Sequence, residues 1–276
     1  MSEGLAFLPM YDVSGTRPAA EALWSALRDA LRAEGIAAPD TIDRSPSRLD
    51  GWSRRDLVLG QTCGLPYIST LADRVTLLGA PDYAVEACPP GFYRSALVVR
   101  ADDRRTDVGA FFGSTFALNG FDSQSGYAAA LSHIAPWAKD GRFFGRAVKT
   151  ASHKASMEAV GAGAADMASI DAVTWRMSIG REAVTDRLRV LALTEPTPGL
   201  PFIARAGAPL EASRRAIERA LSDLPTAADA FGIVGFVRFE RADYGVIAER
   251  LAAANAVVSL PPLEAIDAAG IASPPT

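Results

Sequence analysis

Hydroxyl and imidazole side chains gather at two places where an apolar, strand-like segment gives way to a helix-like one. The residues that open these two helices are Ser123, Gln124, Ser125, Ser152 and His153. The first N–H groups of a helix lack intrahelical partners and carry the positive end of its dipole, so donors placed there favour an anion. The two turns therefore predict one anion-binding site to which both contribute. An ordinary helix N-cap is the alternative reading of each serine.

Polar side chains also follow other predicted strands. Asp171 ends the segment Asp166–Ile170, and open α/β sheets bind ligands at the carboxyl ends of strands. Its carboxylate would suit an amine or a shared proton, or it would cap a following helix. In the first third of the chain the comparable residues are Tyr11, Gln61, Thr62 and Tyr93. We expect the two sets to face each other across one cleft.

Nucleophilic catalysis and metal binding receive little support. The chain contains two histidines and no G-x-S-x-G motif, and His133 is best explained as a structural residue. Cys63, Cys88 and the histidines lie at none of the short spacings of metal ligands, so we predict no metal and no cofactor. The glycines of 161–166 follow a helix and precede a strand, the reverse of the order in a dinucleotide fingerprint.

Nine apolar segments of strand length alternate with helix-like stretches. Several are continuous enough to be buried on both faces, which is typical of an α/β protein with parallel or mixed sheets. The segments are Leu5–Met10, Asp56–Gly60, Val75–Ala80, Ser95–Arg100, Thr115–Asn119, Ala147–Ala151, Asp166–Ile170, Leu188–Leu193 and Pro201–Arg205.

Helical spacing of apolar residues predicts a first helix near 18–34 and two further helices in the last third of the chain. A charged run at 100–109 and a proline-rich run at 194–201 divide the chain into three pieces. The third piece is poor in strands, so we expect it to complete the first lobe. The expected division is 1–100 with 198–276 for lobe 1 and 101–197 for lobe 2, with the ligand cleft between them.

Composition excludes several classes of protein. The 276 residues are 49% hydrophobic and 22% charged, which fits a globular protein with about two domains. The net charge of −4 offers no basic field for nucleic acid, so we predict no nucleic-acid partner. No run approaches the ~18 apolar residues of a membrane span. The short apolar run near the start is not preceded by a basic segment, so no export signal is visible.

Three stretches resemble the phosphate/phosphite/phosphonate-binding proteins of ABC transporters. Residues 152–171 are similar to the family signature S-H-x-x-S-x-x-A-V-x-x-G-x-x-D-x-x-x-x-D, residues 122–127 resemble its D-x-x-S-G-Y segment, and residues 60–67 resemble its first-lobe loop. The likeness extends in order and spacing over nearly the whole chain. One departure concerns the helix start, where the family has adjacent Ser and Thr and this chain has Ser123-Gln124-Ser125.

The resemblance implies a two-lobed α/β fold of the type II periplasmic-binding-protein class, each lobe a mixed sheet flanked by helices. It implies a solute-binding protein that closes by hinge motion on a small anionic or zwitterionic ligand, such as a phosphonate or phosphate ester, without chemistry. Ser123, Ser125 and His153 would hold the ligand oxygens, and Tyr93 and Asp171 would complete the site. We expect a monomer in the periplasm with an ABC permease as partner.

An enzyme on the same fold is the alternative. Chorismate dehydratase of menaquinone synthesis is a cytoplasmic catalyst of this kind. If this chain were such an enzyme, its Asp171 or Asp122 would act as a base near a bound carboxylate. The missing export signal keeps a cytoplasmic location open. A ligand-sensing partner of a membrane receptor is a third reading that sequence does not separate from transport.

Overall fold

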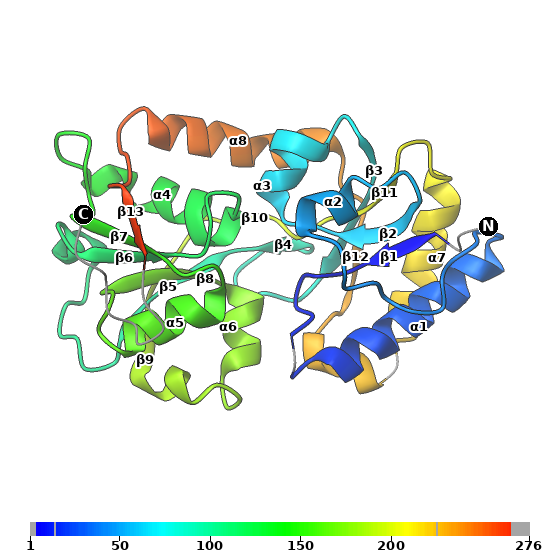
Figure 1. The fold of residues 1–276 in the computed structure, drawn as a ribbon, viewed down its shortest axis with the longest axis horizontal. Helices are drawn as coiled ribbons and strands as arrows, with labels where there is room; N and C mark the ends of the chain where they lie inside the picture. The colour runs from blue at the N-terminus through cyan, green and yellow to red at the C-terminus, as the bar shows by residue number, and fades with distance from the viewer. Residues whose placement is uncertain (1–3, 14, 225, 266–276) are drawn as a thin grey trace. The chain divides into compact units, whose positions relative to one another are not determined.

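The computed structural model describes residues 4–13, 15–224 and 226–265 and divides the chain into two compact units (Figure 1). Unit 1 contains the described residues up to Tyr93 together with those of Thr197–Gly245. Unit 2 contains Arg94–Pro196 and the described residues from Val246 onward. Each unit is a mixed α/β structure, as the alternating pattern of strands and helices predicts.

Unit 1 is built on a five-stranded sheet in the order β1-β2-β11-β3-β12, in which β1 and β2 are parallel and the other neighbours antiparallel. Its strands are β1 Leu5–Phe7, β2 Leu57–Gln61, β3 Val75–Asp82, β11 Phe202–Arg205 and β12 Gly235–Val237, with β4 Phe92–Tyr93 and β10 Thr197–Pro198 as a separate pair. Its helices are α1 Arg17–Ala33, α2 Arg48–Trp52, α3 Gly64–Pro66, the π-helix η1 Tyr67–Leu71, α7 Leu210–Ser222, the 3₁₀ helix η6 Thr226–Phe231 and the start of α8 Arg241–Asn255.

Unit 2 is built on a six-stranded sheet in the order β13-β7-β6-β8-β5-β9. Its strands are β5 Ser95–Arg100, β6 Thr115–Leu118, β7 Arg146–Lys149, β8 Met167–Asp171, β9 Leu188–Leu193 and β13 Leu263–Ala265. Its helices are η2 Val108–Phe111, the π-helix η3 Gln124–Ala128, α4 Ala129–Ile134, η4 Ala135–Trp137, α5 His153–Gly161, α6 Ala172–Ser178, η5 Ala183–Arg187 and the end of α8. All nine strands that the sequence predicts are present, with ends shifted by up to three residues.

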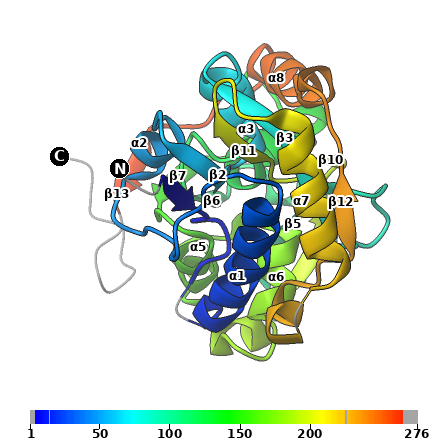
Figure 2. The same ribbon diagram turned by 90° about the vertical axis from the view of Figure 1, so that its right-hand side faces the viewer.

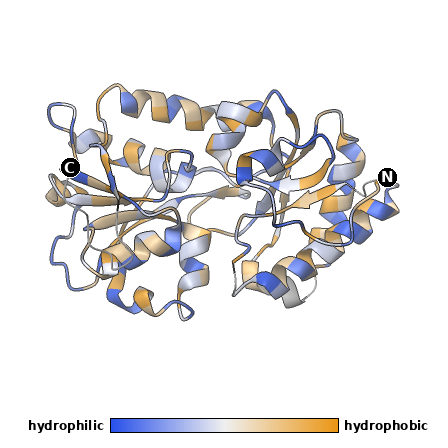
Figure 3. Ribbon diagram, in the orientation of Figure 1, coloured by the Kyte–Doolittle hydropathy of each residue, from blue (hydrophilic) through white to orange (hydrophobic). Residues whose placement is uncertain are grey.

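The central strands of the unit 2 sheet, β5, β6 and β8, are buried on both faces. Successive side chains of a strand point to opposite faces. Leu97 and Val99 of β5 accordingly pack with residues of α4 and the end of α8, whereas Ala96 and Val98 pack with residues of α5. Burial on both faces explains why these strands read as continuous hydrophobic runs, and they carry mostly apolar colouring in Figure 3.

The first helix of unit 1 confirms the prediction made from spacing. It runs over Arg17–Ala33, and its apolar stripe, which includes Leu23, Leu27 and Leu31, is buried. Figure 2 shows α1 beside α7, and the two helices are in contact. Gly35 follows the helix with a φ of +76°, a conformation that glycine adopts without steric cost.

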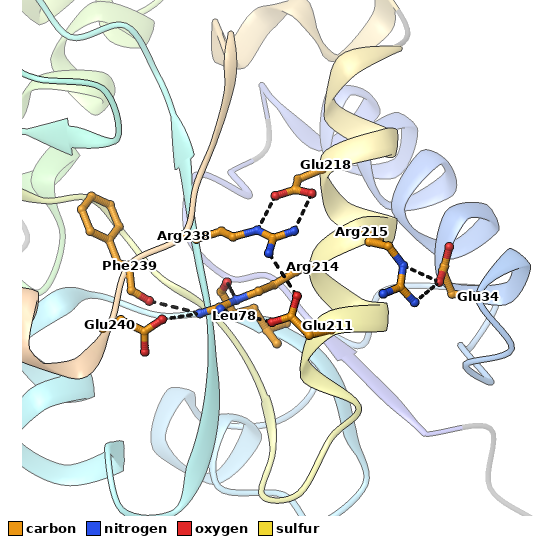
Figure 4. A network of polar contacts seen from close by, with 9 residues as sticks. All are labelled: Glu34, Leu78, Glu211, Arg214, Arg215, Glu218, Arg238, Phe239 and Glu240. Carbon is orange, nitrogen blue, oxygen red and sulfur yellow. Dashed lines mark hydrogen bonds and ion pairs between the residues drawn. The ribbon is translucent and has the colours of Figure 1, made fainter.

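A buried arginine joins α7 to the rest of unit 1 (Figure 4). Arg214 donates from Nε to the main-chain oxygen of Leu78 at 2.9 Å and from Nη2 to that of Phe239 at 3.3 Å. It also pairs with Glu240 at 3.1 Å. Because the arginine side chain is only 7% exposed, these contacts satisfy a charge that would otherwise be buried alone. Arg214 thereby fixes the segment that leads into α8.

The end of the chain corrects one prediction. The sequence assigned 1–100 and 198–276 to lobe 1, but 94–100 and the described residues from Val246 onward belong to unit 2. Residues 94–100 include β5, which pairs with β8 and β9 of the unit 2 sheet. The physical reason is that Leu251 and Ala254 of α8 pack into the core of unit 2, and β13 pairs with β7. The chain therefore passes between the units three times, once within α8, rather than twice. Of the predicted terminal strap, 266–276 lie outside the described residues.

Candidate ligand-binding site

Three neighbouring strands of unit 2 end at the same edge of the sheet. β6 is parallel to both β7 and β8, so the carboxyl ends of all three lie together. After each of these strands the chain turns into a helix, namely η3, α5 and α6. We call residues 119–126, 150–153 and 171 the carboxyl edge of unit 2. This is the kind of edge at which open α/β sheets bind ligands.

The turn after β6 opens its helix with a π turn. Ser123 is the N-cap, and its Oγ accepts a hydrogen bond from the N–H of Gly126 at 3.0 Å. The N–H groups of Tyr127 and Ala128 both donate to the main-chain oxygen of Ser123, at 3.1 and 3.2 Å. Gln124 and Ser125 are buried at the start of this helix. Single π turns of this kind occur frequently at functional sites.

The turn after β7 contains a strained residue. Ala151 has a φ of +68°, which is unfavourable for a residue with a Cβ, and this ends the strand at Lys149 rather than at the predicted Ala151. Ser152 then caps α5 by accepting a hydrogen bond from the N–H of Ala155 at 3.1 Å. The backbone conformation at Ala151 thus sets where His153, the first residue of α5, begins the helix.

The two turns meet through Ser125 and His153. Ser125 Oγ and His153 Nε2 are 2.9 Å apart and share a hydrogen bond whose direction depends on the imidazole tautomer. The main-chain oxygen of Ser125 accepts a second hydrogen bond, at 2.6 Å, from the hydroxyl of Ser169 in β8. The structure therefore confirms that the turns at 123–126 and 152–153 meet. Ser169 was not predicted, although a serine inside a buried strand was a visible signal.

Asp171 lies at the end of β8 and is 2% exposed. Its Oδ1 accepts a hydrogen bond at 2.9 Å from the N–H of Thr174, so it caps α6. This is the structural role that the sequence left open beside a ligand role. A contact between Asp171 and a ligand amine stays a prediction.

Tyr11 and Gln61, two of the four residues predicted in unit 1, belong to one cluster. Tyr83, which the sequence did not indicate, connects them. The ring of Tyr11 packs edge-on against that of Tyr83 at 5.3 Å, and Gln61 Nε2 donates to Tyr83 Oη at 2.9 Å. Tyr11 also has a φ of +64°. These three side chains, with apolar residues that include Leu23 and Phe231, line a cavity of about 10 Å³, room for roughly one water molecule.

Thr62 and Tyr93 are buried within unit 1. The N–H of Thr62 donates to the main-chain oxygen of Pro201 at 3.0 Å. The Thr62 hydroxyl donates to the main-chain oxygen of Cys63 at 3.3 Å. Tyr93 pairs with Thr197 in the β4–β10 ladder and is 2% exposed. These contacts give both residues structural roles, and their contribution to ligand binding stays a prediction.

Two further observations concern the described part of the chain. None of its His, Cys, Asp and Glu side chains gather in groups of three or more that could hold a metal ion. None of its helices combines the length and the apolar character needed to cross a membrane.

The sequence matches the family described as "ABC transporter, phosphonate, periplasmic substrate-binding protein" over residues 59–244. This match covers more than half of the chain. The chain belongs to this family. It is therefore a solute-binding component of the ABC-transporter type. None of the curated proteins matches the chain.

Solved structures show the same fold at low sequence identity. PhnD1 from Prochlorococcus marinus in complex with methylphosphonate has a TM-score of 0.68 and 15% identity over 87% of this chain and 94% of its own. A binding protein component of an ABC phosphonate transporter from Pseudomonas aeruginosa has a TM-score of 0.66 and 13% identity over 91% and 87%. XAC2383 from Xanthomonas citri bound to ATP has a TM-score of 0.65 and 17% identity over 90% and 97%. The fold is thus of the type II periplasmic-binding-protein class.

Proposed function

We propose that the carboxyl edge of unit 2 binds the oxyanion of a small phosphonate or phosphate ester, for delivery to an ABC permease from the periplasm. The hydrogen bond between Ser125 and His153 carries this proposal, because it brings a hydroxyl and an imidazole from two helix starts to within 2.9 Å of each other. A phosphonate group presents oxygens that accept such donors, and helix N-termini favour its negative charge. The proposal includes no chemical step on the ligand.

The buried carboxylate of Asp171 bears on which ligands fit. It ends β8, the strand next to β6, and so belongs to the same edge as the serines. A carboxylate repels a second anion but attracts an ammonium group. A zwitterion that carries both an ammonium group and an oxyanion therefore suits this edge better than a simple dianion. We expect an aminoalkylphosphonate to bind more tightly than methylphosphonate.

A ligand panel tests the proposal. Purified protein is titrated with methylphosphonate, an aminoalkylphosphonate, phosphate, a sulfonate and a dicarboxylate while the unfolding transition is followed. A ligand present at 100 times its Kd adds about 2.7 kcal/mol to the free energy of unfolding. We expect the phosphonates to raise the transition temperature and NMR of the recovered ligand to show it unchanged. No shift with any anion would overturn the proposal, and conversion of the ligand would favour an enzyme.

A charge substitution locates the site. Ser125→Asp places a negative charge beside the ligand oxyanion, so we expect it to abolish phosphonate binding while the protein stays folded. Ser53→Asp adds the same charge at an exposed serine of unit 1 and serves as the matched control. Equal affinity of the two variants would remove Ser125 from the site.

A further inference from the structure

The hydroxyl of Ser123 accepts two hydrogen bonds. One comes from the N–H of Gly126 at 3.0 Å, as expected of an N-cap. The other comes from Nδ2 of Asn119, the residue that follows β6, at 3.2 Å. Ser123 is 9% exposed. Its oxygen is thus buried between two N–H donors, one from the main chain and one from a side chain.

These two contacts fix the direction of the serine proton. A hydroxyl oxygen has two lone pairs and one hydrogen. Both lone pairs of Ser123 Oγ are occupied by N–H groups, and neither of these groups accepts a hydrogen bond from the serine in return. The hydroxyl hydrogen must therefore point away from both donors, toward a third direction, and a buried O–H group favours an acceptor there.

The fit of Asn119 against Gly126 holds this arrangement. A Cβ atom added to Gly126 would lie 1.8 Å from Asn119 Oδ1, so the amide occupies space that only glycine leaves open. Asn119 Oδ1 is buried and accepts no hydrogen bond from the described residues. The amide thus turns its nitrogen toward Ser123 and packs its oxygen over the glycine.

We propose that Asn119 is a positioning residue that holds the Ser123 hydroxyl as a dedicated donor to an oxyanion oxygen of the ligand. This inference rests on the proposed function, since it presumes that the carboxyl edge of unit 2 binds an oxyanion. It distinguishes the two serines of the turn. Ser125 shares its hydrogen bond with an imidazole that can donate or accept. The Ser123 oxygen already accepts two hydrogen bonds, so toward a ligand its hydroxyl can only donate.

A double-mutant cycle tests the proposal with methylphosphonate as the probe and calorimetry as the readout. The variants are Asn119→Ala, Ser123→Ala and the double variant. Loss of a hydrogen bond to a charged group raises Kd by about 10- to 100-fold, so we expect a rise in this range for Ser123→Ala. We expect a smaller rise for Asn119→Ala, and no further rise when it is added to Ser123→Ala. An Asn119→Ala effect of equal size in both backgrounds would overturn the proposal, because Asn119 would then act independently of Ser123.

An isosteric variant tests the direction of the proton. In Asn119→Asp the carboxylate offers only acceptors, so the serine proton turns toward residue 119, and the added negative charge also repels the oxyanion. For both reasons we expect Kd to rise more than in Asn119→Ala. Affinity equal to that of the original protein would overturn the proposal, because it would mean that the amide oxygen already faces Ser123. Unfolding transitions of all variants are measured in parallel, and Asn119→Ser replaces Asn119→Ala if the latter does not fold. Failure of the original protein to bind methylphosphonate or any other anion is the separate result that overturns the proposed function.

Discussion

Replacement of Gly126 by alanine disturbs the turn at a single, calculable point. The new Cβ would lie 1.8 Å from Asn119 Oδ1 and 3.1 Å from Ser123 Oγ. An ordinary contact begins near 3.4 Å, so the amide oxygen must retreat by about 1.6 Å, the difference between these two distances. The Asn119 side chain cannot move this far and keep its 3.2 Å hydrogen bond to Ser123.

The cost of this displacement follows from its parts. A lost hydrogen bond costs about 0.5–1.5 kcal/mol and an off-rotamer side chain a similar amount. The reduced entropy of the unfolded chain offsets about 0.4–1 kcal/mol. We therefore expect Gly126→Ala to lower the free energy of unfolding by roughly 0.5–2 kcal/mol. Because the Ser123 hydroxyl loses its fixed direction but is still present, we also expect Kd for methylphosphonate to rise, by less than the roughly 10- to 100-fold expected for Ser123→Ala.

The assay combines chemical denaturation with calorimetry of methylphosphonate binding. Gly235→Ala is the matched control, since a Cβ there meets no atom within 4 Å and the φ is not positive. We expect the control to leave both quantities nearly unchanged. If Gly126→Ala matched the control in stability and in affinity, the contact between Asn119 and Gly126 and the role assigned to this turn would both be refuted.

Three further expectations concern buried polar groups. Ser169→Ala removes the 2.6 Å hydrogen bond to Ser125, so we expect the free energy of unfolding to fall by about 1–3 kcal/mol. We also expect calorimetry to show a higher Kd for methylphosphonate. An unchanged Kd would show that this bond does not position Ser125. Arg214→Met leaves two buried main-chain oxygens without their donor, so we expect the free energy of unfolding to fall by about 2–5 kcal/mol in chemical denaturation. The control Arg215→Met removes an exposed arginine and should cost less than about 1 kcal/mol. Equal losses would contradict the role assigned to the buried Arg214. Burial raises the pKa of Tyr67 to about 12, so its neutral form contributes its full stability below about pH 10 and loses it as pH rises toward 12. Tyr67→Phe should flatten that decline in transition temperature, and an unaltered decline would assign it to other groups.

Local patterns were sufficient to predict β6, β7 and β8 and the turns of the candidate site, but not the short strands β4, β10, β12 and β13. Buried strands of unit 2 read as apolar runs because both faces of the sheet are covered, and the polar residues after 118 and 149 marked where the helices begin. Because β6, β7 and β8 are parallel, residues after their carboxyl ends had to lie at one edge. This is why the meeting of Ser125 and His153 was predictable without a structure.

Features that depend on long-range packing were not predictable. Val246 and the residues after it were assigned to the wrong lobe, because the sequence does not show against which core the second half of α8 packs. The contact of Ser169 with Ser125 depends on the register of β8 beside the turn, and Tyr83 is connected to Tyr11 and Gln61 only through the fold. The role of Asp171 as a helix cap was one of two alternatives that its position allowed.

Nuclear magnetic resonance of the histidine side chains tests the central claim most directly. The chain contains two histidines, so ¹⁵N-labelled imidazole signals are assigned with a single His133→Gln variant. His133 lies in α4, where burial lowers its pKa, and serves as an internal control. On titration with methylphosphonate we expect the signals of His153, and not those of His133, to shift in step with binding. Saturation of the protein with methylphosphonate, as measured by calorimetry, without any shift at His153 would contradict an oxyanion site at the carboxyl edge of unit 2.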